Sequence, residues 1–228
     1  MSALAFLTAT LAACTPAQDG AAQSGATAPA TECRLPSGAN WREAATPDDR
    51  TRLRTWRDAW TAALDTIRAR EGMAAVSAEG PLLEPDRALA TDPLPPEGDY
   101  RCRTIKLGVR DDTRATVSTL PAQPCRMTRD GDVLRLTQTQ GLQRVNGTVY
   151  PDTAARGVFL GTLSLTDEPT PLGYGEDSVR DMAGLVERVA ERKWRIVLPR
   201  PALESTLDVI EVTPARPFHR HPREGGDR

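Results

Sequence analysis

Cysteine is the most informative of the residues that could carry out chemistry in this chain. The chain has 228 residues and four cysteines, Cys14, Cys33, Cys102 and Cys125. Cys102 and Cys125 both lie in predicted strands, and closing a loop of this length stabilises a fold by roughly 3 kcal/mol. We predict that these two form a disulfide, which requires an oxidising compartment. Cys33 is then the spare thiol.

Most catalytic arrangements are missing from the predicted domain. The two histidines, His219 and His221, both lie at the C-terminal end of the sequence, so the domain has no imidazole for a catalytic triad or a zinc site. No Walker, CxxC or GxSxG motif occurs. The sequence therefore predicts no catalytic residue, no metal and no cofactor, and it favours a protein that is not an enzyme.

The start of the chain is typical of an export signal. Residues 3–13 are uncharged and mostly apolar, a run too short to span a bilayer, and it ends in the letters LAAC. This ending resembles the lipobox of bacterial lipoproteins, in which the chain is cut before the cysteine and the cysteine carries the lipid. The resemblance implies a signal peptide at residues 1–13 and lipidation of Cys14.

The segment after the predicted cleavage site has the composition of a linker. Residues 14–32 contain no large apolar residue and consist mainly of Ala, Gly, Thr, Pro, Ser and Gln. Such a segment cannot bury enough surface to offset the entropy of ordering, so we expect a flexible tether. A lipid on Cys14 would anchor the protein in the bacterial cell envelope, facing the periplasm. The residue after the lipidated cysteine, Thr15, favours sorting to the outer membrane.

Helical periodicity dominates the first part of the domain. Thr46 and Pro47 are typical of a helix start, and Gly72 is a plausible stop. Between them apolar residues recur at steps of three and four: Leu53, Trp56, Trp60, Leu64 and Ile67. We predict one long amphipathic helix of about 25 residues whose tryptophans belong to the core.

From Asp99 onward the periodicity is that of strands. About eight strands joined mostly by short turns predict an antiparallel meander. Asp130-Gly131 and Asn146-Gly147 are hairpin signals, and another turn is predicted near Glu191-Arg192. Because a sheet must cover or close its edges, we expect an α+β fold: a calycin-like small barrel, or a strongly curved sheet capped by the long helix.

Several segments, taken in their order along the chain, resemble a known family. These are ATPDDR, GDYRCRTIKLG, GLQRVNG, VFLGTLSL, GYGED and RKWRIVLPRPALESTLDVIEVTP. They are similar to the uncharacterised bacterial family "domain of unknown function 4893". The resemblance covers the single globular domain that we predict at residues 33–214, before a disordered tail at 215–228. It implies an envelope location, and it implies no activity and no catalytic residues.

The longest irregular segment between strands, residues 167–182, is the predicted binding site. It carries Tyr174 between two glycines, and Trp194 points to the strand face that should line the concavity of the sheet. We expect a largely apolar pocket near both rings, with Arg101 or Arg103 at its rim as a potential anion ligand. The sequence leaves open that Trp194 is an ordinary core residue.

Charge and composition narrow the class of partner. The net charge of −2 at pH 7 gives no electrostatic case for nucleic acid. The favoured function is a non-enzymatic, lipid-anchored binding module for an envelope protein or an apolar small molecule. Two alternatives stay open: an envelope hydrolase that uses carboxylates and arginines, and a calycin-type periplasmic protease inhibitor.

Overall fold

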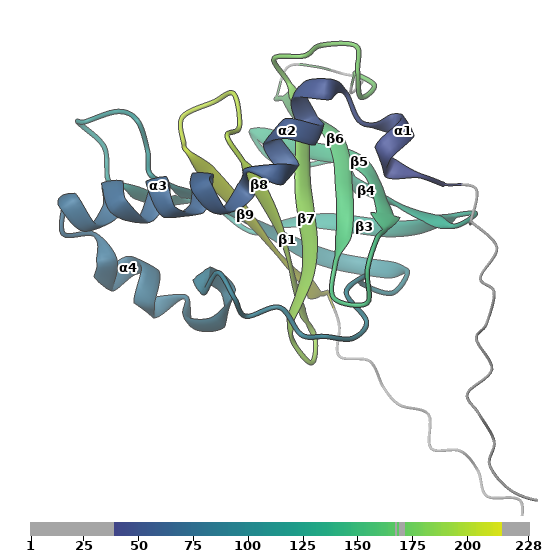
Figure 1. Cartoon of the computed structure of the whole chain (residues 1–228), viewed down its shortest axis with the longest axis horizontal. Coiled ribbons are helices and arrows are strands. Elements are labelled where there is room, and N and C mark those ends of the chain that lie inside the picture. Colours follow the sequence, from purple (N-terminus) through teal and green to yellow (C-terminus); the bar gives the residue numbers. More distant parts are fainter. Residues whose placement is uncertain (1–38, 167, 169–171, 216–228) are drawn as a thin grey trace, which may run out of the picture. The chain divides into compact units, whose positions relative to one another are not determined.

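The structure is a computed structural model that describes residues 39–166, 168 and 172–215 (Figure 1). These residues belong to the second of two compact units, Pro36–Arg228. Several sequence predictions lie outside the described residues: the signal peptide, Cys14, the tether, Cys33, both histidines and the tail beyond Ala215.

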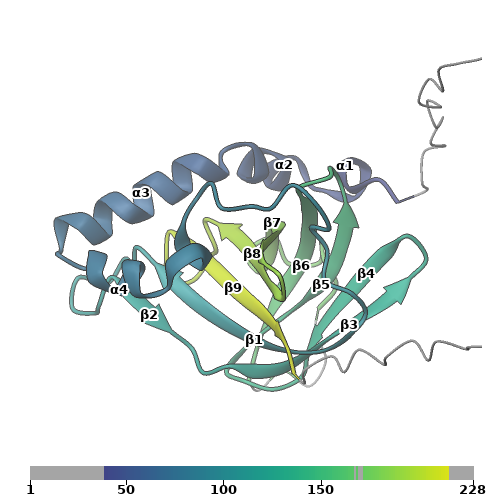
Figure 2. The same cartoon turned by 90° about the horizontal axis from the view of Figure 1, so that it is seen from below.

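Within the described residues, nine antiparallel strands form one sheet, and eight of them close it into a barrel (Figures 1 and 2). The sheet order is β2-β1-β3-β4-β5-β6-β7-β8-β9, and β1 also pairs with β9, which closes the ring. β2 extends β3 along the same edge of β1. The strands are β1 Gly98–Leu107, β2 Val117–Thr119, β3 Gln123–Asp130, β4 Val133–Gln138, β5 Gln143–Pro151, β6 Gly157–Leu165, β7 Asp181–Ala190, β8 Lys193–Pro199 and β9 Leu207–Pro214.

A helical layer covers one side of the barrel, as Figure 2 shows most clearly. Its elements are α1 Trp41–Ala44, α2 Pro47–Arg54, α3 Trp56–Ala69, α4 Met73–Ala78 and the 3-10 helix η1 Gly80–Leu83. The expected α+β fold with a small antiparallel barrel is therefore confirmed. None of the helices in the described part of the chain is long and apolar enough to cross a membrane.

The expected single long helix is divided at Thr55. Its backbone leaves the helical conformation (φ −100°, ψ 21°), and α2 and α3 lie on either side of it. The Thr55 hydroxyl donates to the carbonyl of Thr51 at 3.0 Å, one helical turn back. Such a bond competes with the backbone ladder and bends helices, and sequence periodicity does not reveal it. The predicted start is confirmed, because the Thr46 hydroxyl caps α2 by accepting from Asp49 N.

The turn predictions are confirmed at two positions and wrong at one. Hairpins join β3 to β4 after Asp130 and β7 to β8 after Ala190. The Asn146-Gly147 signal does not mark a turn, because β5 runs straight through it and pairs with β6. A Cβ atom at Gly147 would lie 2.5 Å from the Cα of its partner Gly161, so this glycine serves close strand approach.

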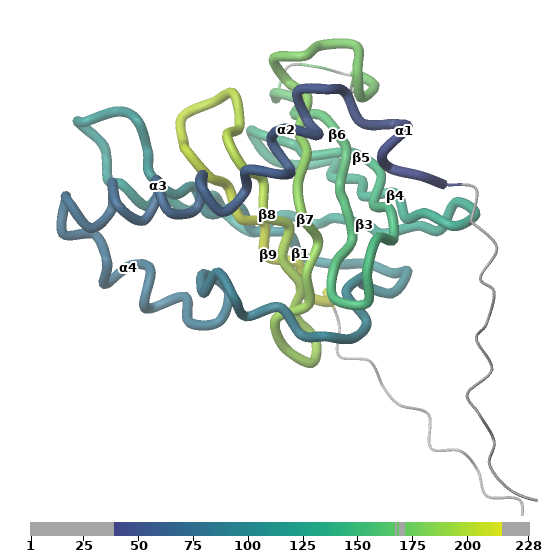
Figure 3. The backbone as a smooth tube through the Cα atoms, viewed as in Figure 1, coloured from purple at the N-terminus to yellow at the C-terminus, as the bar shows by residue number. Residues whose placement is uncertain are grey.

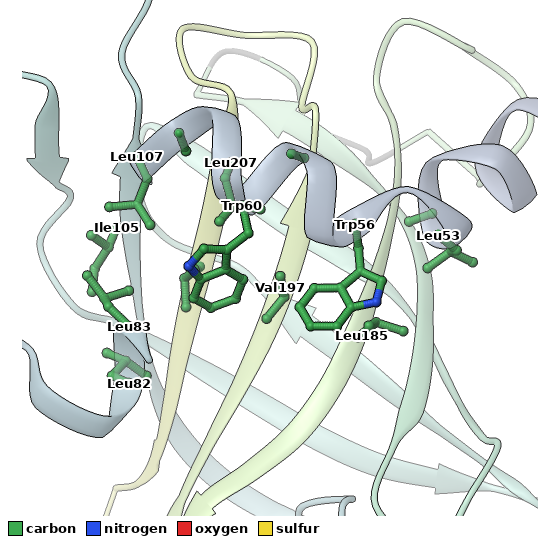
Figure 4. Packing of buried hydrophobic residues seen from close by; sticks show 14 of the residues in the cluster. Leu53, Trp56, Trp60, Leu82, Leu83, Ile105, Leu107, Leu185, Val197 and Leu207 are labelled. Carbon is green, nitrogen blue, oxygen red and sulfur yellow. The ribbon is translucent and has the colours of Figure 1, made fainter. Parts of the chain in front are cut away.

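Two hydrophobic clusters lie on opposite faces of the barrel wall. The inner cluster fills the barrel with seventeen buried side chains, among them Tyr100, Phe159, Trp194 and Ile196. The outer cluster joins the wall to the helices, where Trp56 and Trp60 pack over Leu185 and Val197 (Figure 4). Both tryptophans are core residues, as the helical spacing predicts.

A row of alternating charges crosses four neighbouring strands on the outer face. Glu187, Arg195, Glu211 and Arg103 are successive register partners on β7, β8, β9 and β1. Arg103 continues the row to Glu79 at the end of α4, with contacts of 2.5 and 2.8 Å. We call these residues the charge row. It fastens the helical layer to the barrel by directional bonds in addition to apolar packing.

Candidate binding site at the loop end of the barrel

The two ends of the barrel differ in the length of their connections. Antiparallel pairing places residues 108–116, 139–142, 200–206 and the described part of the β6–β7 connection (166, 168 and 172–180) at one end, which we call the loop end (Figure 3). The opposite end has the short turns at 131–132 and 191–192 and the connection 152–156. Long connections on a rigid scaffold are where binding residues concentrate.

One cavity at the loop end has an amide-rich wall. Its volume is about 320 Å³. Polar groups come from Thr104, Gln123, Gln138, Gln143 and Thr166, and apolar surface comes from Cys102, Leu120, Pro121 and Leu142. A glutamine amide both donates and accepts hydrogen bonds. Gln138 uses both amide atoms within the chain, with Gln140 O and Val145 N, and Gln143 donates to Glu204. The wall is therefore uncharged, and the Gln123 amide is available to a ligand with paired donors and acceptors.

The disulfide predicted from the sequence braces this cavity. Cys102 on β1 and Cys125 on β3 are bonded, with their Cα atoms 5.8 Å apart. Both residues are buried in the inner cluster. The bond fixes the strand pair from which Thr104 and Gln123 reach the cavity.

A buried ion pair closes the barrel interior beside the cavity. Lys106 and Asp208 are register partners on β1 and β9, and their Nζ and Oδ2 atoms are 3.1 Å apart. Both side chains are almost wholly buried. Burial raises the pKa of Asp208, an effect that Lys106 and the Ser205 hydroxyl oppose by contacting the carboxylate. The pair is satisfied within the chain, so it does not supply a free nucleophile or base.

Glu204 links the ion pair to the cavity. Its carboxylate contacts Lys106 at 3.5 Å, Gln143 at 3.3 Å and Arg114 at 3.3 Å. Burial disfavours its ionised form, but these neighbours outweigh burial and hold the pKa of Glu204 below its usual value. Glu204 has a left-handed backbone (φ 66°), an uncommon conformation for a residue with a side chain. The loop is thus folded so that this carboxylate stays charged at the mouth.

An aliphatic pocket opens at the same end. Its volume is about 90 Å³, and it is lined by Leu163, Leu165, Val179, Arg180, Met182, Pro201, Ala202 and Leu203. Three exposed apolar residues line these two cavities: Leu142 (72%) in the amide-walled cavity, and Val179 (65%) and Leu203 (36%) in the aliphatic pocket. Exposed apolar side chains gathered at one end of a barrel are typical of an interaction surface.

The predicted pocket between Tyr174 and Trp194 does not form. Trp194 lies in the inner cluster, where it stacks edge-on against Tyr100 with ring centres 6.1 Å apart. Tyr174 packs against the outer cluster, and its hydroxyl donates to Asp49 at 2.6 Å. The two rings lie on opposite faces of the wall, so Trp194 is the core residue that the sequence left open.

The two predicted rim arginines also lie on the outer face. Arg103 belongs to the charge row and is bonded to Glu79 and Glu211. Arg101 donates to the carbonyl of Ala122 at 2.8 Å. Strand alternation correctly groups both with Ile105 and Leu107, but that face looks toward the helices. Arg101 and Arg103 therefore do not line the cavity at the loop end.

The residues that build the loop-end site were not selected from the sequence. Gln123 stands in no motif, and Gln143, Glu204 and Lys106 lie in segments whose family resemblance implies no site. Lys106 and Gln123 come together with the end of β9 because β1 pairs with both β3 and β9, and closure of the barrel brings Gln143 of β5 to the same end. Within the described ranges no group of three or more His, Cys, Asp and Glu residues could hold a metal ion.

These features define the class of protein as a closed antiparallel barrel with a helical layer and a ligand-sized mouth at its loop end. The chain belongs to the family described as domain of unknown function (DUF4893), whose model matches residues 41–212. That range contains the helical layer, the described strands β1 to β9 except the last two residues of β9, and the loop-end site. No curated protein and no solved structure matches the chain.

Proposed function

We propose that this protein is a lipid-anchored envelope module that binds an extended segment of a protein partner at the loop end. One observation carries the proposal: an amide-walled cavity, an aliphatic pocket and three exposed apolar side chains share one end of the barrel. A peptide in extended form presents both kinds of surface, with backbone amides for the glutamines and side chains for the aliphatic pocket.

A peptide fits better than a wholly apolar small molecule. The barrel interior is filled by the inner cluster, so the space that remains is the mouth. The mouth has hydrogen-bonding capacity to use, because the Gln123 amide has no partner among the described residues. An apolar ligand would leave such groups unpaired, at a cost of about 1–3 kcal/mol each.

The sheet supports the same partner class. β2 is the end strand of the sheet order and pairs only with β1 among the described strands. Leu120, in the link after this short strand, lines the amide-walled cavity. Ser118 of β2 lines a further cavity of about 300 Å³ together with Lys106 and Glu204. An open strand edge offers backbone donors and acceptors to an added strand.

Anchoring enters the proposal through Cys14. Each buried CH₂ of an attached lipid contributes about 0.8 kcal/mol to membrane binding, so several acyl chains hold a protein firmly. Replacing Cys14 with Ser is expected to leave unprocessed precursor or soluble protein. Fractionation of membranes and mass spectrometry of the N-terminus measure this. Fully processed, membrane-bound Cys14→Ser protein would refute the anchor.

Site-specific photocrosslinking in cells tests the binding proposal. A photoreactive residue replaces Leu142 in one variant and Leu203 in another, and a third carries it at exposed Asp132 in the opposite turn. We expect both loop-end probes to capture the same partner and Asp132 to capture none. A Gln123→Leu substitution in the Leu142 probe should reduce that product. Equal capture from Asp132, or different products from the two loop-end probes, contradicts the assignment.

A further inference from the structure

A second, separate hollow lies on the outer face of the barrel over β4, β5 and β6. Its volume is about 230 Å³. Its polar lining consists of Arg135, Thr137, Asn146, Thr148, Thr162 and Tyr174. No carboxylate lines it, and Arg135 is the one charged residue among the described lining residues. It shares none of these residues with the loop-end cavities.

Two lining residues have buried polar atoms that no other described residue satisfies. Asn146 Nδ2 and Thr162 Oγ1 have no hydrogen-bond partner within the described part of the chain. Thr162 is only 3% exposed, and Asn146 and Thr162 are direct register partners on β5 and β6. Buried polar groups in native proteins nearly always have partners, so two neighbouring exceptions mark a position where the wall can form hydrogen bonds with a bound molecule.

The unsatisfied capacity is mainly that of a donor. Asn146 Oδ1 already accepts from Gln138 N at 2.8 Å, which leaves only the Nδ2 hydrogens to offer. Thr148 Oγ1 accepts from Arg135 at 3.2 Å and keeps its own proton for another acceptor. Thr162 can both donate and accept. The inner part of the hollow is therefore uncharged and rich in hydroxyl and amide groups.

The rim adds the remaining features. The Tyr174 hydroxyl is occupied by Asp49 and by Thr46 N, so only the ring is left for contact with a ligand. Leu172, which is 38% exposed, supplies apolar surface beside it. The Arg135 guanidinium is already paired with Asp130 at 3.0 Å. A full negative charge would thus meet mostly neutral groups, which favours a neutral ligand with many oxygens.

We propose that this hollow binds a sugar residue of a glycan. Sugar hydroxyls donate and accept in the same way as the threonines, and the apolar face of a sugar ring suits Tyr174 and Leu172. This inference is independent of the loop-end proposal, because the hollow shares no lining residue with the two loop-end cavities on which that proposal rests.

Titration of the full chain with glucose, N-acetylglucosamine and inorganic phosphate tests the proposal. The readout is the NMR amide signals of Gly147, Gly161 and Gly173, which all border the hollow. We expect at least one of the two sugars, at concentrations up to tens of millimolar, to give saturable shifts, and phosphate to give none. Thr162→Val keeps the shape and removes the hydroxyl, and it should weaken binding about tenfold.

The controls separate binding from folding. Asn146→Asp keeps the oxygen that accepts from Gln138 N but removes the donor, so it should also weaken sugar binding. Ser164→Ala is the matched control, because Ser164 has a buried, unpartnered hydroxyl on the same strand outside the hollow. It should bind like the natural chain. The proposal is overturned by no sugar response, by shifts that survive Thr162→Val, or by a response to phosphate alone.

Discussion

Among the charged side chains, we expect replacement of Arg195 to lower the free energy of unfolding most. It is fully buried in the charge row, and its Nε and Nη2 atoms donate to Glu187 at 2.9 and 2.7 Å. The same guanidinium donates to the carbonyls of Leu82, Glu84 and Pro85 at 2.9, 2.7 and 3.0 Å, and it lies 4.8 Å from the centre of the Trp60 ring. One side chain therefore holds the connector after α4 against the barrel.

The magnitude follows from these contacts. Removing one partner of a buried ion pair costs about 3–5 kcal/mol. Arg156 still contacts Glu187 at 2.7 Å, which favours the lower part of that range. Three connector carbonyls lose their donor, and a lost hydrogen bond costs about 1 kcal/mol. We expect Arg195→Met to lower the free energy of unfolding by about 5 kcal/mol, a large share of the stability of a typical domain.

Thermal and urea unfolding of the oxidised protein measure the effect. For a domain of this size, 5 kcal/mol corresponds to a fall in Tm of about 10–20 °C. The matched control is Arg126→Met, because Arg126 and Asp99 are a surface pair with both side chains more than half exposed. Such a pair contributes at most about 1 kcal/mol. If the two variants differ by less than 1 kcal/mol, the role given to Arg195 is wrong.

Three further predictions concern the barrel and the helical layer. Replacing Cys102 and Cys125 with Ala should lower the free energy of unfolding by about 3 kcal/mol in urea titrations, because the unfolded chain regains its loop entropy. Lys106→Met leaves Asp208 buried without its cation and raises the pKa of that carboxyl further. A raised folded-state pKa means that stability falls as pH rises, so unfolding at a series of pH values should show a larger loss near pH 8 than near pH 5. Tyr174→Phe removes two hydrogen bonds to the start of α2 and should lower the free energy of unfolding, measured by urea titration, by about 1–3 kcal/mol. A loss of less than a few tenths of a kcal/mol would show that these bonds do not hold α2.

Local signals predicted the parts of the fold that depend on neighbours in sequence. The Asp130-Gly131 turn, the β7–β8 hairpin and the helix cap at Thr46 depend on a few consecutive residues. The disulfide between Cys102 and Cys125 was also predictable, since both cysteines lie in predicted strands, whereas Cys33 lies at the edge of the predicted tether. Each of these inferences requires only the local preference of a turn, a strand or a cap.

Features set by strand pairing were not predictable from one sequence. Asn146-Gly147 carries a turn signal, yet Gly147 lies opposite Gly161 because β5 is held by both of its neighbours. Strand alternation predicts that Trp194 shares a face with Ile196, but it does not reveal on which side of the wall the segment of Tyr174 lies.

A hydrophobic pattern in the sequence also does not reveal which charged residues are buried. Arg195 and Lys106 read as solvent-facing residues of their strands, and their burial follows from partners a long way off in sequence. Arg195 bonds carbonyls of residues 82–85, and Lys106 faces Asp208. The loop-end site depends on the same long-range pairing, so its glutamines have no sequence signature.

Closure of the barrel by β1 and β9 sets an order on folding. Leu107 and Leu207 are register partners although a hundred residues separate them. The second edge of β1 therefore stays unpaired until β9, the last strand, has been made and has docked. Contacts between such distant segments form slowly, and an uncovered strand edge invites pairing with other chains. The bond from Cys102 to Cys125 joins β1 to β3, its partner much nearer in sequence. Formation of this disulfide therefore fixes the pairing of β1 with β3 before β9 is available on the other edge. A chain kept reduced during synthesis lacks this bond and is exposed to aggregation for longer than an oxidised one.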